Sequence, residues 1–431
     1  MLVTPLPRAL LPATAAIHSD GVLTVGGCNV LALAEEFGTS LFVYDEQHLR
    51  DRCREAIGAF GDGVAYASKA FLCKAMATLV HQEGLCIDVS TGGELRVAVA
   101  AGVPGERLVL HGNNKSAREL AEAAGAGVGR IVVDSFDEID RLETLHAETG
   151  WLPRVLVRVT PGVAAHTHEY VMTGQEDTKF GFSIQSGAAA AAVERLSRLG
   201  RAKVVDLIGI HAHIGSQIFL LASFVKAVEA MAGFVSPLGL PELCVGGGLG
   251  VPYVEGEEAP TIMQWAATVR EACQTAGVPD DVRLTAEPGR AIAAGAAITV
   301  YTVGTIKRLP GIRTYVAVDG GMSDNPRPVL YGSGYEAFLP RVTDAPRPLA
   351  ATVVGKHCES GDVVVRDAHL PDDVAVGDIL ATPVTGAYGH SMASNYNKVP
   401  RPPVVFVRDG KANVVVRRET YDDLLRLDDD L

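Results

Sequence analysis

Short runs of β-branched and other apolar residues alternate with longer amphipathic stretches between residues 60 and 290. Eight of these runs have the length of buried strands: Val64–Ala67, Leu85–Val89, Leu108–His111, Ile131–Asp134, Val155–Thr160, Val205–His213, Leu243–Gly246 and Val282–Glu287. The segments between them contain helix-like runs, such as Glu94–Ala101 and Asp137–Glu148. This alternation predicts an α/β fold with a closed parallel (β/α)8 barrel, and an open doubly wound sheet is the competing arrangement.

The pattern changes after about residue 297, where strand-like runs follow one another with few helical stretches between them. These runs are Ile298–Val303, Thr314–Val318, Thr352–Val354, Val363–Arg366, Ile379–Val384, Val404–Arg408 and Val414–Arg417. They predict a second, mostly β domain, either a barrel or a sandwich. The strand-like Val22–Val25 near the N-terminus is expected to join it. We therefore expect an N-terminal segment at 1–40, a barrel at 41–296 and a β domain at 297–431.

Composition and charge narrow the class of protein. The chain has 431 residues, of which 48% are hydrophobic, so it is long and apolar enough for a sizeable core. Its net charge of −13 disfavours nucleic acid and anionic membranes as partners. No stretch reaches the roughly 18 unbroken apolar residues that a membrane span requires.

The N-terminus and the cysteines bear on localisation. Pro5, Pro7 and Pro12 interrupt the region where an export signal needs a continuous apolar stretch. The 7 cysteines are scattered, without a CxxC pair, which is typical of reduced cytosolic thiols. We expect a cytoplasmic protein in which six of the cysteines are small buried hydrophobes and Cys358 is the exception.

Polar and glycine residues gather directly after the predicted strands, at the barrel rim that carries the chemistry of such enzymes. They include Lys69, Asp88, His211 with His213, Ser216, Gly246–Gly250 and Glu287–Arg290. Barrels commonly bind phosphate in the loops after their last strands, and glycine backbone, Ser216 and Arg290 suit an anion. The glycine run is not a dinucleotide-binding fingerprint, because residue 251 is Val where the last glycine would fall.

Two features of this rim allow several interpretations. His211 and His213 fit a metal site, packed core side chains, or one imidazole lying flat against a planar cofactor, and the lack of histidine between 213 and 357 disfavours metal. Lys69 is either a solvated charge or, given its apolar neighbours, a buried amine. A buried amine that faces a phosphate site suggests a Schiff base with a phosphorylated aldehyde.

An ordered set of motifs resembles one enzyme family along nearly the whole chain. The motifs are Tyr66–Ala70, His111–Ser116, Thr160–Gly162, His166–Ser183, His211–Gln217, Gly246–Gly250, Glu287–Arg290, Asp319–Tyr331, Cys358–Asp362 and Gly386–Asn397. The chain resembles the alanine-racemase-like class of pyridoxal-phosphate enzymes, and within it the diaminopimelate decarboxylases of the ornithine, lysine and arginine decarboxylase class-II family. The resemblance implies pyridoxal 5'-phosphate as cofactor. The segment His166–Phe182, rich in glycine, threonine and charge between the fifth and sixth predicted strands, is expected to be a mobile lid over the site.

The resemblance also implies a role for individual residues. Lys69 and Cys358 match the catalytic residues, as the lysine that binds the cofactor aldehyde and as the proton donor. Cofactor-binding residues would be Lys69, Asp88, His213 (stacked on the ring), Ser216, Gly248, Glu287, Pro288, Gly289, Arg290 and Tyr388. Substrate-binding residues would be Arg290, Arg327, Tyr331, Glu359 and Tyr388, and no metal is implied. Family members are head-to-tail homodimers in which Cys358–Glu359 would complete the neighbouring subunit's site.

The reaction implied is decarboxylation of meso-2,6-diaminopimelate to L-lysine and CO2, the last step of lysine biosynthesis. Glu287 matches the carboxylate beside the pyridine nitrogen, where racemases of the class have arginine; taken alone, a Glu287–Arg290 salt bridge is the simpler interpretation. A related decarboxylase acting on ornithine, arginine or carboxynorspermidine is the nearest alternative. A catalytically silent binding protein and a metal-dependent hydrolase are alternatives from other classes.

Overall fold

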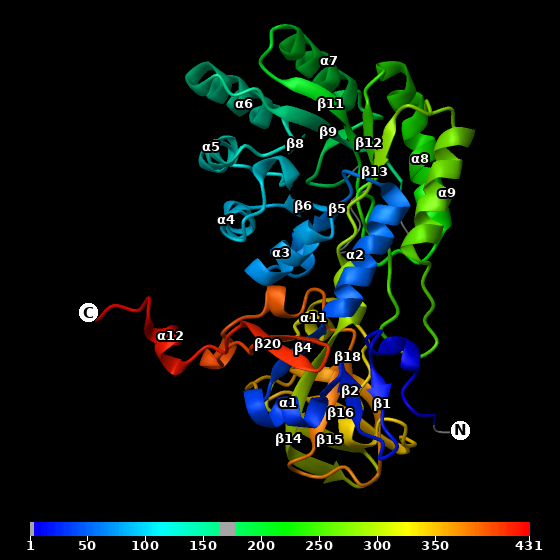
Figure 1. Ribbon diagram of the computed structural model, residues 1–431, viewed down its shortest axis with the longest axis vertical. Coiled ribbons are helices and arrows are strands. Elements are labelled where there is room, and N and C mark those ends of the chain that lie inside the picture. Colours follow the sequence, from blue (N-terminus) through cyan, green and yellow to red (C-terminus); the bar gives the residue numbers. More distant parts are fainter. Residues whose placement is uncertain (1–3, 164–176) are drawn as a thin grey trace. The chain divides into compact units, whose positions relative to one another are not determined.

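The chain forms two compact units in the computed structural model, which describes residues 4–163 and 177–431 (Figure 1). The barrel unit comprises Arg52–Val251 and Ala259–Ala291. The β unit comprises Met1–Asp51, Pro252–Glu258 and Ile292–Leu431. Of the expected lid, residues 166–176 lie outside the described part of the chain.

Eight parallel strands form the barrel unit's sheet in the order β13-β12-β11-β9-β8-β7-β6-β5, and β10 (Phe182–Ser183) pairs with β9. Their bounds are β5 Ala65–Ala67, β6 Cys86–Val89, β7 Leu108–Leu110, β8 Arg130–Val133, β9 Arg154–Thr160, β11 Asp206–His211, β12 Glu242–Cys244 and β13 Arg283–Thr285. Two backbone hydrogen bonds join the first strand to the segment after the last. Ala65 N–H donates to Ala286 O at 2.9 Å, and Ala67 N–H donates to Pro288 O at 3.4 Å. The predicted barrel is confirmed over the open sheet.

Helices surround these strands in Figure 1. Their bounds are α2 Glu46–Phe60, α3 Lys74–Gln82, α4 Gly92–Ala100, α5 Ala117–Ala126, α6 Phe136–Thr149, α7 Ala188–Arg201, α8 Leu221–Val235, α9 Ile262–Thr275 and α10 Arg290–Ala293. Side-chain oxygens of Thr91, Ser116, Ser135 and Thr261 accept backbone N–H groups at the starts of α4, α5, α6 and α9. Such caps satisfy donors that have no partner inside the helix, and so they fix where each helix begins.

One helical stretch, Leu221–Leu238, is long and apolar enough by composition to cross a membrane. It consists of α8 and the short 3-10 helix η5 (Ser236–Leu238). Phe224, Val228 and Met231 on α8 are buried. A helix that buries one apolar face within a globular unit has this same composition, so the finding is weak support for a membrane span.

The barrel interior is filled by small and medium apolar side chains from successive strands: Ala65, Cys86, Val109, Val132, Leu156, Ile208 and Cys244. Two of them are cysteines, which act here as small hydrophobes. The prediction of six buried cysteines holds for five. Cys73 is half-buried, and its Sγ accepts the Met76 N–H at 3.4 Å and caps α3; Cys358 is exposed.

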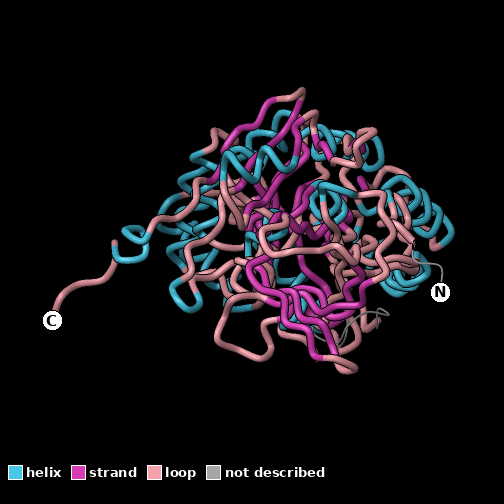
Figure 2. Tube along the Cα trace, turned by 90° about the horizontal axis from the view of Figure 1, so that it is seen from below, coloured by secondary structure: helices cyan, strands magenta, loops and turns pink. Residues whose placement is uncertain are grey.

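The β unit contains a sheet in the order β17-β16-β15-β14-β4-β19-β20, with β18 paired to β14. The bounds are β4 Leu41–Asp45, β14 Ala297–Leu309, β15 Arg313–Val318, β16 Leu349–Val354, β17 Val363–Leu370, β18 Ile379–Pro383, β19 Val404–Arg408 and β20 Lys411–Val416. A small sheet of β1 (Ala16–Ile17), β2 (Leu23–Val25) and β3 (Cys28–Asn29) and the helices α1 (Val30–Phe37), α11 (Arg327–Tyr331) and α12 (Tyr421–Leu425) complete it. The residues after β20 extend away from this unit's strands (Figure 2).

The first boundary between the units differs from the one expected at residues 40 and 41. Strand β4 pairs antiparallel with β14 and parallel with β19, and all five of its residues are buried. Residues 41–51 and 252–258 therefore belong to the β unit rather than to the barrel. The sequence pattern could not show this, because a strand's partners lie far away along the chain.

Candidate active site

Two of the side chains expected to bind cofactor, Asp88 in β6 and Glu287 after β13, lie at the carboxyl ends of barrel strands. His211, the other member of the histidine pair noted in the sequence, ends β11. His111 directly follows β7. Because the carboxyl ends of parallel strands meet at one rim, residues far apart in sequence come together here.

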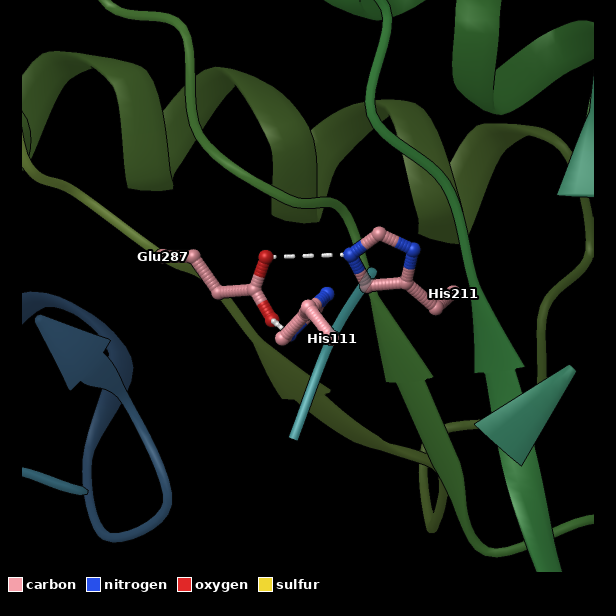
Figure 3. A group of neighbouring side chains, drawn as sticks. All are labelled: His111, His211 and Glu287. Carbon is pink, nitrogen blue, oxygen red and sulfur yellow. Dashed lines mark hydrogen bonds and ion pairs between the residues drawn. The ribbon is translucent and has the colours of Figure 1, made fainter. Parts of the chain in front are cut away.

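Glu287 lies between two imidazoles (Figure 3). His111 Nε2 lies 2.9 Å from Glu287 Oε1, and His211 Nε2 lies 3.0 Å from Glu287 Oε2. All three side chains are buried. Burial raises the pKa of Glu287, but the two histidines outweigh it and hold that pKa well below its usual range. Glu287 is therefore an ionised carboxylate in a dry setting.

Asp88 is the second buried carboxylate of this rim. His111 Nε2 lies 3.8 Å from Asp88 Oδ1. Burial raises the pKa of Asp88 to about 6, against the opposing effect of His111 and with a further rise from Glu287. The two carboxyl groups thus share one imidazole and differ in their affinity for a proton, which is typical of functional sites.

Lys69 is exposed, and the expectation of a buried amine is wrong. Its neighbours Ser68 and Ala70, which belong to the same 3-10 turn η2 (Ser68–Ala70), are buried. The ammonium still acts on the rim: it lowers the pKa of Asp88 and of His213. Because the Lys69 ammonium is exposed to water, it needs no ionic partner. Its influence on Asp88 and His213 shows that it lies near the rim, where it could attach a ligand at the barrel mouth.

His213 points to the glycine loop rather than to Glu287. Its Nδ1 accepts the Gly247 N–H at 3.0 Å. Burial first, and then the Lys69 ammonium, lower the pKa of His213 well below its ordinary value. The ring is therefore neutral with its proton on Nε2, and a neutral imidazole is suited to lie against an aromatic ring.

The loops after the last strands form a narrow polar cradle. Arg290 Nη2 donates to Ser216 Oγ at 2.9 Å. Gly248 has a φ of +111°, and a Cβ there would clash with the Gly215 carbonyl. A Cβ on Gly289 would lie 2.9 Å from the Cβ of Ala67, beside the barrel-closing bond to Pro288 O. Backbone approach this close, with hydroxyl and guanidinium donors, fits an anionic phosphate group.

Five of the predicted residues belong to the β unit. Arg327, in α11, is buried; its guanidinium carbon lies 4.3 Å from the centre of the Tyr253 ring, and its Nη1 donates to Tyr335 Oη at 2.5 Å. Tyr331 ends α11 and is half-buried. Tyr388 has a φ of +59°, a conformation that is unusual for a tyrosine and occurs most often at functional sites.

Cys358 and Glu359 are exposed on a loop that is firmly held. Asp362 accepts the backbone N–H groups of Met322 at 2.7 Å and His357 at 2.8 Å. The Tyr396 hydroxyl donates to Glu359 Oε1 at 2.6 Å. The thiol and carboxylate are thus presented to the surroundings on a fixed backbone.

Sequence reasoning missed the role of His111. It placed the residue at a strand end and within a motif. The tendency of barrel enzymes to carry their functional residues at the carboxyl ends of the strands could have singled it out. It also considered His211 and His213 as a metal pair. Among the described residues, the group whose geometry would hold a metal is His111, His211 and Glu287, without His213, and its histidines instead contact Glu287 at hydrogen-bonding distance. Nor is Arg290 needed to explain the ionised Glu287, since the two histidines suffice.

Comparison with known proteins gives a consistent result. The sequence profile described as "Pyridoxal-dependent decarboxylase, pyridoxal binding domain" matches residues 46–294. A diaminopimelate decarboxylase of Mycobacterium tuberculosis is 49% identical over 429 residues, 95% of each chain, and one of Bacillus subtilis is 46% identical over 436 residues, 97% of this chain and 98% of that one. Crystal structures of diaminopimelate decarboxylase from M. jannaschii, one of them in complex with L-lysine, superpose with a TM-score of 0.90 at 32% identity and cover 97% of this chain and 98% of theirs.

Proposed function

Because the chain belongs to the diaminopimelate decarboxylase family of pyridoxal-dependent decarboxylases, we propose that it converts meso-2,6-diaminopimelate to L-lysine and CO2. This is the last step of lysine biosynthesis. The observation that carries the proposal is the ionised Glu287, held by two imidazoles at the mouth of the barrel beside the Ser216–Arg290 cradle. No metal is needed for this reaction.

Pyridoxal 5'-phosphate supplies an aldehyde for covalent attachment and a ring that accepts the electron pair released when CO2 departs. In this proposal Lys69 would hold the cofactor covalently, and Ser216, Gly248 and Arg290 would hold its phosphate. His213 would lie against the ring, and Asp88 would support the Lys69 side. Pro288 and Gly289 form the backbone wall beside β5.

Glu287 decides the direction of the chemistry. An ionised carboxylate next to the pyridine nitrogen favours the protonated ring, which is the stronger electron acceptor. The depressed pKa of Glu287 means that this carboxylate stays charged at neutral pH despite its burial. An arginine at this position would leave the nitrogen neutral, as in racemases of this class. Glu287 therefore supports decarboxylation.

Arg327 supports the choice of substrate. The partners described for its buried guanidinium, Tyr253 and Tyr335, are neutral, so its charge is available to a substrate carboxylate. Arg290 adds a second cation, Glu359 suits the ammonium of the non-reacting end, and Tyr331 and Tyr388 complete the substrate set. Ornithine or lysine lacks the distal carboxylate and would leave Arg327 unpaired, at a cost of about 1–3 kcal/mol.

Cys358 is assigned as the proton donor to the carbon that has lost CO2. Both Cys358 and Glu359 are exposed in the single chain, which suits residues that complete the site of a second subunit. We therefore propose a homodimer with active sites shared across its interface. Its seven free cysteines agree with a cytoplasmic location.

Incubation of the purified protein with meso-diaminopimelate tests the proposal directly. We expect release of CO2 and, by chiral analysis, L-lysine, whereas ornithine, arginine and carboxynorspermidine should react far more slowly. Lys69→Ala should lose the visible absorbance band of the bound cofactor. A preparation that takes up no pyridoxal phosphate, or that prefers ornithine, would contradict the proposal.

A further inference from the structure

His111 is a buried titratable group of the rim whose part in the proposed reaction is so far only its contact with Glu287. It follows β7, whereas Glu287 follows β13 and His211 ends β11. Each oxygen of Glu287 faces a different imidazole, with Oε1 at 2.9 Å from His111 and Oε2 at 3.0 Å from His211 (Figure 3). Three strand ends thus hold one carboxylate.

This arrangement fixes both the charge and the orientation of Glu287. A buried carboxylate takes up a proton unless donors stabilise its ionised form. With an imidazole nitrogen in contact with each oxygen, rotation of the carboxylate would break both contacts. The two rings lie 5.0 Å apart and are inclined by 67°, so their edges converge on the carboxylate from two directions.

His111 also differs from His211 in what else it contacts. Its Nε2 faces Asp88 Oδ1 at 3.8 Å as well as Glu287. At this distance the approach to Asp88 is too long for a hydrogen bond, so Nε2 lies near both carboxyl groups without being bonded to Asp88. Other charged or titratable groups also interact with these two carboxyl groups: Lys69, Glu94, Arg158, His211, His213 and Cys244.

We propose that His111 is a positioning residue: its Nε2, in contact with Glu287 Oε1, keeps Glu287 ionised and oriented as the acceptor for the ring nitrogen of the cofactor. The inference rests on the proposed function, because it concerns how Glu287 meets that ring. His111 does not touch the reacting carbon. Its removal therefore affects the protonation of the ring nitrogen more than the binding of substrate.

Two substitutions of similar polarity separate this role from simple packing. The amide nitrogen of Gln reaches the place of an imidazole Nε2, whereas the amide of Asn reaches only the place of Nδ1. His111→Asn therefore removes the donor to Glu287 and His111→Gln retains it. The exposed His369 on β17, changed to Asn, is the matched control.

The experiment uses holoenzyme loaded with pyridoxal phosphate labelled with 15N in its ring. In the wild type, in His111→Gln and in His369→Asn, we expect the 15N shift of a protonated ring nitrogen across the neutral pH range. In His111→Asn the shift should move toward the neutral ring at a lower pH. Its kcat should fall by about 10- to 100-fold with little change in KM, the scale of one charge-assisted hydrogen bond.

The outcomes separate the inference from the function beneath it. If His111→Asn binds cofactor and keeps the wild-type 15N profile, His111 has no such role and the inference is overturned, while the decarboxylase assignment stands. Stoichiometric zinc in the wild type that disappears in His111→Asn would overturn it in favour of a metal site. If His111→Asn does not fold, a His111→Gln enzyme with the wild-type profile supports the inference, and one with a neutral ring overturns it. Wild-type protein without decarboxylase activity would refute the proposed function itself.

Discussion

Replacing Lys115 with Met should strongly destabilise the barrel unit. Lys115 Nζ is buried, donates to Gly112 O and Val132 O at 2.7 Å each, and lies 2.8 Å from Glu138 Oε1. Methionine has similar length but no charge and no donor. It leaves Glu138 buried with the Asp134 N–H, at 2.9 Å from Oε2, as its remaining described donor.

The expected cost follows from the loss of one partner of a buried ion pair, which is about 3–5 kcal/mol. Removing the second charge as well, in Lys115→Met/Glu138→Gln, should reduce the cost to about 1–2 kcal/mol, because no unpaired charge remains.

Burial already raises the pKa of Glu138, and Lys115 opposes that rise. Without Lys115 the pKa of Glu138 in the folded protein rises further above its unfolded value. The free energy of unfolding therefore falls as pH increases from the unfolded pKa to the folded pKa of Glu138. The single variant should therefore be penalised less at pH 5 than at pH 8, as is expected of a carboxyl group with an unfolded pKa of about 4.3.

Urea unfolding followed by tryptophan fluorescence measures the free energy of unfolding of the barrel unit. The chain has 2 tryptophans, Trp151 and Trp265, and both lie in the barrel unit. If the single variant loses less than about 1 kcal/mol, or if the double variant is the less stable of the two, the pair does not act as an isolated buried ion pair. The pH dependence supplies an independent check, since a defect of packing alone would be constant between pH 5 and pH 8.

Three further predictions concern the site. Cys358→Ala should reduce kcat by at least about 100-fold while the cofactor's absorbance titration stays unchanged, and equal turnover would remove Cys358 from the mechanism. Gly248→Ala should weaken pyridoxal phosphate binding by about tenfold or more, because its Cβ meets the Gly215 carbonyl at a φ of +111°; Gly125→Ala, with no neighbour within 4 Å, is the control. Asp88→Asn should raise the Tm of cofactor-free protein at pH 8 but not at pH 4. The pKa of Asp88 is raised to about 6 in the folded protein, so ionised Asp88 destabilises the fold as pH rises through that value. An equal shift of Tm at both pH values would contradict this.

The barrel could be predicted from sequence because its strands are buried on both faces. Runs such as Val155–Thr160 and Leu85–Val89 are apolar enough to be recognised without knowledge of their partners, and strand β9 begins one residue before the first run. Because the carboxyl ends of barrel strands meet at one rim, Asp88, Ser216 and Glu287 could be predicted to gather there. These deductions need only local pattern and the geometry of a parallel barrel.

Features that depend on non-local pairing or on side-chain direction were not predictable. Strand β4 has the composition of a barrel strand, and only its pairing with β14 and β19 assigns it to the β unit. Lys69 has buried neighbours in its turn of 3-10 helix, yet it is itself exposed. The contact of His111 with Glu287 joins residues 176 positions apart (287 − 111), which no local pattern encodes.

The membership of β4 in the later sheet has a consequence for how the protein is made. On the ribosome, Leu41–Asp45 leaves the exit tunnel long before its antiparallel partner Ala297–Val300 has been translated. The barrel can fold in the meantime, while a mostly apolar segment remains with both edges unpaired, the condition under which nascent chains misassociate or recruit chaperones. A fragment made to express the barrel unit by itself should accordingly start after Asp45. A fragment that starts earlier would carry strand β4 without its partners β14 and β19, and would be prone to aggregate.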